Sequence, residues 1–266
     1  MVEVSTVIPI DAGSDKNLDT LLRRYDKAKS SRENWVSLFE ECYEYALPQR
    51  ESFYAETPGQ RRDDKIFDET AVVGVQEFAS RLQSGLVPNF ARWADFIAGS
   101  EVPQEQRESV NAQLQEVTDY VFEVLQNSNF AQEVHESFLD LAVGTGVLLC
   151  EEGDAVNPVR FSAIPLPHVV LDVGPDDRVD NIFRERQIRG SQLMVAYPKA
   201  TLTKKILEKV NNNPEEKHKI LEVVYRDYSK MNVMAHKYCV IDLQTKEKIL
   251  EEQYEGVGSC PIIAYR

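Results

Sequence analysis

Pairs of adjacent acidic residues are the most obvious candidates for chemistry in this chain. They include Glu40-Glu41, Asp63-Asp64, Glu151-Glu152, Asp176-Asp177, Glu215-Glu216 and Glu251-Glu252. Carboxylates that converge on divalent metal ions can support hydrolysis. Neighbours on a helix or a strand point in different directions, however, so an adjacent pair does not form such a site by itself. Solvated faces or turns are the simpler interpretation, and a metal-dependent hydrolase with carboxylates from different elements stays an alternative.

The other residue types with catalytic or ligating chemistry lack the spacing that such sites need. The four histidines are scattered, and we expect His135 to be a hydrogen-bonded packing residue on a helix. The four cysteines are far apart, which favours free thiols in a reducing cytoplasm. The segment Gly144-Thr145-Gly146 runs from a helix into a strand, the reverse of a phosphate-binding loop, and predicts a structural turn. We therefore expect no catalytic residue, no metal ligand and no cofactor.

Two groups of basic residues are candidates for contacts between subunits or with DNA. Arg61, Arg62 and Lys65 lie in a loop of mixed charge, and Arg184 and Arg186 alternate with an acidic residue along a strand. A guanidinium group can bind either a phosphate or a carboxylate of a neighbouring subunit. For the strand pair, cross-strand pairing, subunit pairing and a solvated face are all open, and the solvated face is the simplest interpretation.

Composition limits the classes of partner. The net charge is −14, which argues against a general nucleic-acid-binding surface. The simpler interpretation is that the acidic excess only keeps the protein in solution, and an acidic wall past which DNA slides is the alternative. Apolar residues make up 42% and charged residues 28% of the chain, which is typical of a folded protein. No apolar stretch approaches the roughly 20 residues that span a bilayer, so we expect no membrane partner.

Hydrophobic periodicity predicts an α+β fold, with an N-terminal helical half packed with an antiparallel β-rich region. Residues 1–17 are expected to form an arm, 18–144 the helical part and 145–266 the β-rich part. Helices are predicted at residues 18–46, 68–85, 104–127, 129–144, 191–197 and 202–210. Strands are predicted at residues 147–150, 159–164, 169–173, 179–188, 221–225, 238–243, 248–254 and 260–266. The strand at 221–225 alternates apolar and polar side chains and is expected to be half-buried.

The helix after the mixed-charge loop has clear start and stop signals. Asp68 is a good N-cap, Gly85 stands where a C′ glycine ends a helix, and Pro88 prevents continuation. We expect Trp93 and Phe96 to lead back onto the same core. A capping box of Asn129 and Gln132 is expected to open the fourth helix.

The order and spacing of several segments resemble the N-terminal part of the head-to-tail connector (portal) proteins of short-tailed, T7-like bacteriophages. The segments are Trp35 to Tyr54, Ile66-Phe67-Asp68-Glu69-Thr70-Ala71, Phe78-Ala79-Ser80-Arg81-Leu82, Leu86-Val87-Pro88 with Arg92-Trp93, Leu141 to Leu149 and Val179 to Gln187. No single motif decides the matter, and the likeness becomes loose beyond residue 187. The resemblance implies the wing-like region of a portal subunit and a structural function.

Further expectations follow from this resemblance. Identical subunits would form a twelvefold ring at one capsid vertex, through which double-stranded DNA enters and leaves. The implied partners are the terminase packaging motor, scaffolding and capsid proteins, and tail adaptor proteins. The ring would be assembled in the host cytoplasm and kept in the virion. Because related portals continue past residue 266, we expect this chain to be an N-terminal portion, or the product of a shortened gene, that lacks the stem, clip and crown regions. A soluble helical adaptor protein is the remaining alternative.

Overall fold

The computed structural model describes residues 15–50, 53, 65–174, 177–227, 235–254 and 260–266, and it confirms the predicted α+β class. The described residues fall into two compact units. One unit comprises residues up to 36 together with 168–262, and the other comprises 37–167 together with 263–266. Most of the predicted N-terminal arm lies outside the described residues, and its last three residues belong to helix α1 (Asp15–Ala46). The division into arm, helical part and β-rich part stays a prediction.

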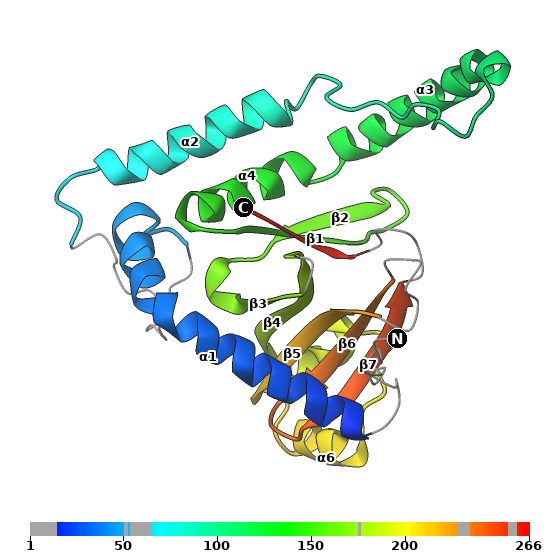
Figure 1. The fold of residues 1–266 in the computed structure, drawn as a ribbon. Helices are drawn as coiled ribbons and strands as arrows, with labels where there is room; N and C mark the ends of the chain where they lie inside the picture. Colours follow the sequence, from blue (N-terminus) through cyan, green and yellow to red (C-terminus); the bar gives the residue numbers. More distant parts are fainter. Residues whose placement is uncertain (1–14, 51–52, 54–64, 175–176, 228–234, 255–259) are drawn as a thin grey trace, which may run out of the picture. The chain divides into compact units, whose positions relative to one another are not determined.

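The first unit is built on a five-stranded antiparallel sheet with the order β3-β4-β5-β6-β7. Its strands are β3 (Val169–Val173), β4 (Val179–Arg189), β5 (Lys217–Arg226), β6 (His236–Asp242) and β7 (Glu247–Tyr254). The first half of α1 covers one face through Leu21, Tyr25 and Ala28, which pack against Phe183 and Leu221. Figure 1 shows this helix lying across the strands. Helix α1 therefore supplies the side chains that complete the hydrophobic core on this face of the sheet.

The other face of the same sheet is covered by short helical segments. These are a 3-10 turn η2 (Gly190–Gln192), α5 (Leu193–Ala196) and α6 (Lys204–Asn212). Leu193 and Ile206 are buried there against Ile220 and Val240. Strand β5 is consequently buried on both faces from residue 220 to 225. The prediction of a half-buried strand was wrong, because alternation of polar and apolar side chains cannot reveal that the polar face is also covered.

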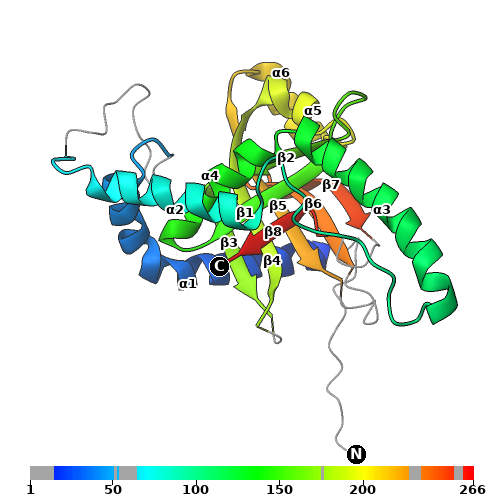
Figure 2. The same ribbon diagram turned by 90° about the horizontal axis from the view of Figure 1, so that it is seen from above.

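The second unit packs helices on a three-stranded sheet with the order β2-β1-β8. The strands are β1 (Gly146–Glu152), β2 (Val159–Ala163) and β8 (Ile262–Tyr265), and a 3-10 turn η1 (Leu166–His168) follows β2 in the chain. The helices are α2 (Thr70–Leu86), α3 (Gln104–Asn127) and α4 (Phe130–Val143). Ala79 of α2 packs with Val134 and Phe138 of α4 in the core of this unit. Figure 2 shows β8, from the end of the chain, beside β1.

Two details of α2 differ from the sequence prediction. The helix continues through Gly85 to Leu86, and the Val87 N–H closes its last turn by donating to Gln83 O at 2.9 Å. Gly85 therefore has no C′ role, and Pro88 supplies the stop signal. At the other end, Asp68 Oδ1 does accept from the Thr70 N–H at 2.7 Å, although the helix begins one residue later than a cap at Asp68 implies.

The capping box predicted for α4 is absent, because its asparagine is used elsewhere. Asn129 makes no cap hydrogen bond. Its side chain instead bonds both the N–H and the C=O of Phe161, at 2.9 and 2.8 Å. Glu133 Oε2 accepts from the Ala163 N–H at 2.7 Å. Helix α4 thus satisfies the backbone of edge strand β2, which would otherwise offer free pairing groups to another chain.

The segment after α2 runs along α3 and holds the predicted aromatic pair. The Phe96 N–H donates to Thr118 Oγ1 at 3.2 Å, and the Ala98 N–H donates to Asn111 Oδ1 at 2.8 Å. Trp93 packs edge-to-face with Phe122, with ring centroids 5.3 Å apart. Both side chains stay partly exposed, at 41% for Trp93 and 50% for Phe96, and the expected packing is seen in the ring contacts of Trp93.

Candidate functional site

The predicted basic residues fall into three different situations. Arg61 and Arg62 lie outside the described residues. Lys65 forms an ion pair with Glu44 near the end of α1, and the two side chains are 65% and 35% exposed. An exposed pair of this kind contributes little to stability. Lys65 therefore remains accessible to another molecule, and its proposed role at an interface stays a prediction.

Arg184 and Arg186 are brought together by one buried carboxylate. Arg184 Nη1 lies 3.2 Å from Glu222 Oε2, and Arg186 Nη1 lies 2.9 Å from Glu222 Oε1. Tyr197 also donates to Glu222 Oε1 at 2.5 Å. Burial opposes the charge on Arg186, but Glu222 outweighs that effect and raises the pKa of the guanidinium group. Of the alternatives that the sequence left open, cross-strand pairing is present, and a solvated face is wrong for Arg184, which is 14% exposed.

Glu185, the residue between the two arginines, makes its contacts on the opposite face of the sheet. Glu185 Oε1 accepts from Tyr25 OH at 2.5 Å and from Lys29 Nζ at 2.8 Å, which ties α1 to β4. Burial and the neighbouring carboxylate raise the pKa of Tyr25 to about 12. The alternation of charge along β4 is therefore explained by partners within this chain, because successive side chains of a strand reach opposite faces.

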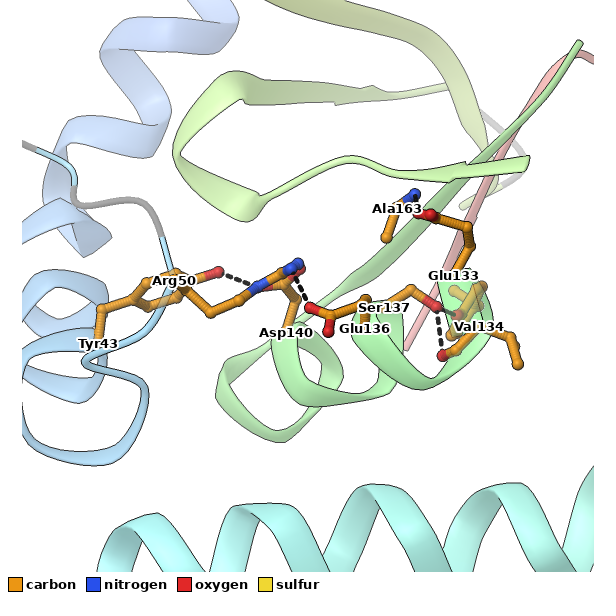
Figure 3. Close-up of polar contacts among 9 residues, drawn as sticks. Tyr43, Arg50, Glu133, Val134, Glu136, Ser137, Asp140 and Ala163 are labelled. Carbon is orange, nitrogen blue, oxygen red and sulfur yellow. Dashed lines mark hydrogen bonds and ion pairs between the residues drawn. The ribbon is translucent and has the colours of Figure 1, made fainter. Parts of the chain in front are cut away.

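A buried polar cluster that the sequence analysis missed fixes the position of α4 (Figure 3). Asp140 is fully buried and accepts hydrogen bonds from Tyr43 and Arg50. Arg50 Nη1 also lies 2.5 Å from Glu136 Oε2. Burial raises the pKa of Asp140, and Arg50 and Tyr43 oppose that shift. An acidic residue inside the apolar run FLDLAV was the signal for such a site, since a buried carboxylate needs partners.

A second group of close contacts joins α4 to both β1 and β8. Ser137 donates to Val134 O at 2.8 Å and shares a hydrogen bond with Tyr265 OH. A Cβ atom at Gly146 would lie 2.9 Å from Ser137 O and 2.5 Å from the Tyr265 ring. Glycine at the start of β1 is thus required for this packing. The predicted structural turn from helix to strand is confirmed.

The exposed surface of α2 and its flanking segments is rich in large apolar side chains. Phe67 and Phe90 are 96% and 95% exposed, and Phe78 and Leu86 are 41% and 58% exposed. A shallow hollow on the helix is lined by Gly74, Glu77, Phe78, Arg81 and Leu82. Apolar surface that folding leaves uncovered commonly marks a contact with another protein. Nothing in the sequence analysis had separated this face from the buried side of the same helix.

Two further features that would bear on function are a metal-binding group of side chains and a membrane-spanning helix. No group of three or more His, Cys, Asp or Glu side chains there is placed to hold a metal ion. No described helix is long and apolar enough to cross a membrane. His135 bonds Gln83 Oε1 through Nδ1 at 3.0 Å, as a packing residue should. The feature that favours contacts with other proteins is the exposed apolar surface of α2.

Comparisons with known proteins point in the same direction. The family described as bacteriophage head to tail connecting protein matches residues 18–266. A protein described as a probable portal protein, from Bordetella phage BPP-1, is 25% identical over 184 residues. That alignment covers 67% of this chain and 32% of the relative. The chain therefore spans about a third of the length of the curated relative that it matches.

Proposed function

Because this chain belongs to the family of bacteriophage head-to-tail connecting proteins, which are structural rather than enzymatic, we propose that it is a portal subunit. In this proposal identical subunits assemble into a ring at one vertex of the capsid. The observation that carries the proposal is the family match over nearly the whole chain. The exposed apolar surface of α2 supports it, since a ring needs subunit contacts.

The finer parts of the proposal follow from the same family membership. The ring is twelvefold, and double-stranded DNA passes through it during packaging and ejection. Its partners are the terminase packaging motor, scaffolding and capsid proteins, and tail adaptor proteins of a short-tailed phage. The net charge of −14 fits a channel wall to which DNA does not adhere. Assembly in the host cytoplasm precedes incorporation into the virion.

The basic loop is proposed to contribute to contacts between subunits. Lys65, at its end, is exposed apart from a surface pair with Glu44. Arginine binds carboxylates bidentately, and an acidic protein offers many carboxylates. Replacing Arg61 and Arg62 with Ala is expected to weaken self-association in dilute salt. Unchanged association of that variant would show that these arginines do not contribute to contacts between subunits.

Light scattering on the purified chain tests the proposed self-association. The expected result is a particle with the mass of many copies of the chain, without any added protein. A monomer at all accessible concentrations would contradict the proposal. A monomer that binds only a different protein would instead favour a soluble adaptor.

A further inference from the structure

One face of helix α3 combines acidic and aromatic side chains and is turned fully to solvent. Glu116, Tyr120 and Glu123 follow one another at helical spacing, and Tyr120 is 65% exposed. They lie opposite Thr118 and Phe122, the buried residues of the helix. In the described part of the chain, no ion pair holds either glutamate. This surface, the α3 face, therefore combines unneutralised negative charge with exposed aromatic area.

A face that carries two lysines is formed by the helical segments that cover one side of the five-stranded sheet, and the single acidic residue of α6, Glu208, is also exposed. Lys204 and Lys205 open α6 after its cap residue Thr203, and Lys205 is 75% exposed. Leu207 on the same helix is 42% exposed. On the neighbouring short helix α5, Met194 and Val195 are 48% and 80% exposed. We refer to these five lysine and apolar residues as the α5–α6 face.

The position of the two lysines is locally unfavourable. Cations in the first turn of a helix oppose the helix dipole, which favours acidic residues there. Glu247 offsets this only in part, since its Oε1 lies 3.5 Å from Lys205 Nζ. Departures from local preference tend to occur at functional positions. The lysines are therefore explained better by a partner with negative charge than by the stability of α6.

We infer that the α3 face of one copy of this chain docks on the α5–α6 face of an adjacent copy. The inference rests on the proposed self-assembly and assigns surfaces to it. Closed rings need two different complementary patches on each subunit, and these two faces differ in charge while both carry exposed apolar side chains. The α2 surface offers less charge for such pairing, because both of its charged residues, Glu77 and Arg81, bond each other at 3.0 Å, whereas Lys204 forms no ion pair in the described part of the chain.

Charge reversal with rescue tests the docking of the two faces in the full chain. The first variant carries Glu116→Lys and Glu123→Lys, the second carries Lys204→Glu and Lys205→Glu, and the third carries all four changes. Each of the first two variants places like charges opposite each other and should weaken self-association about tenfold or more at 0.15 M salt. The third variant restores opposite charges and should recover most of the lost association.

The controls separate an interface from a folding defect or from a general effect of net charge. Glutamate suits the first turn of a helix, but at position 205 it would lose the pair with Glu247, so circular dichroism of the second variant must match that of the wild type before its association is compared. A variant with Glu151→Lys and Glu152→Lys, both exposed at the end of β1, changes net charge as much as the first variant and should associate like the wild type.

The outcomes distinguish this inference from the proposal on which it rests. Recovery in the fourfold variant supports docking between the two faces. A wild-type oligomer that withstands both reversals, or a fourfold variant as weak as the single-face variants, would overturn the inference alone. A wild-type chain that stays monomeric would overturn the proposed self-assembly and this interface with it.

Discussion

At the scale of single residues, buried carboxylates with several donors each organise the two units. In one unit the Asp140 carboxylate accepts hydrogen bonds from Tyr43 and Arg50. In the other unit the Glu222 carboxylate binds Arg184, Arg186 and Tyr197. Removing one partner from a buried ionic cluster leaves the others desolvated and uncompensated. These residues should therefore be sensitive to substitution.

Replacing Asp140 with Ala should lower the free energy of unfolding by about 3 kcal/mol, because Arg50 would stay buried without its main counter-charge. Urea unfolding followed by circular dichroism measures the change. The matched control is Asp119→Ala on α3, whose exposed carboxylate bonds Arg92 at 2.8 Å and should contribute less than about 1 kcal/mol. Equal losses in the two variants would contradict this account.

Glu185 should make stability depend on pH in the acid range. Burial alone would raise its pKa, but hydrogen bonds from Lys29 and Tyr25 lower it below the ordinary 4.5. Its contribution is therefore complete above pH 4.5 and is lost as the pH falls through the lowered pKa of the folded state. A Glu185→Gln variant should lose less stability over that range, as measured by urea midpoints at several pH values. If the stability of the variant changed with pH as steeply as that of the wild type, Glu185 would not be the source of the pH dependence.

At the scale of elements, two glycines with opposite surroundings give a paired prediction. Gly146→Ala should destabilise the protein by about 1–3 kcal/mol, because its Cβ would press on the backbone carbonyl of Ser137. Gly74→Ala should stabilise it by up to about 1 kcal/mol, because the space beside Gly74 in α2 is open and alanine favours the helix. Thermal unfolding of both variants checks the signs. A stable Gly146→Ala variant would show that the junction of α4 and β1 can relax.

The sequence predicted the positions of the helices and strands better than the contacts that their side chains make. The limits of α3 and β3 agree with the prediction, because strong periodicity and flanking proline or glycine signals are local properties. The partners of Asn129 and Asp140 depend on residues far along the chain, and local patterns do not contain that information. For the same reason the capping box was wrong, and the strand at 221–225 proved to be buried on both faces.

The candidate site was predictable only in part. The absence of a catalytic motif and the family resemblance were both readable from the sequence, and the family comparison confirms the resemblance. The basic residues were chosen by charge alone, and charge does not show that Arg184 and Arg186 share Glu222 within the same chain. Exposed apolar side chains on α2 and α3 became visible only once the fold showed which helix faces are covered.

At the scale of the whole molecule, the protein is a structural connector protein, and we propose that its two compact units supply surfaces for contacts with other copies. Membership of the connector family and exposed apolar and charged faces together favour assembly over catalysis. The chain spans about a third of the length of the phage relative, so contacts made elsewhere in that protein are additional to those proposed here.

End-on electron-microscope images of the purified particle test the central claim of self-assembly into a ring most directly. The account predicts class averages with a closed ring, a central opening and rotational symmetry, expected to be twelvefold. Ring closure requires each subunit to use two different faces, so every copy in the ring should look equivalent. Images that show only monomers or two-fold dimers without an opening would contradict the account.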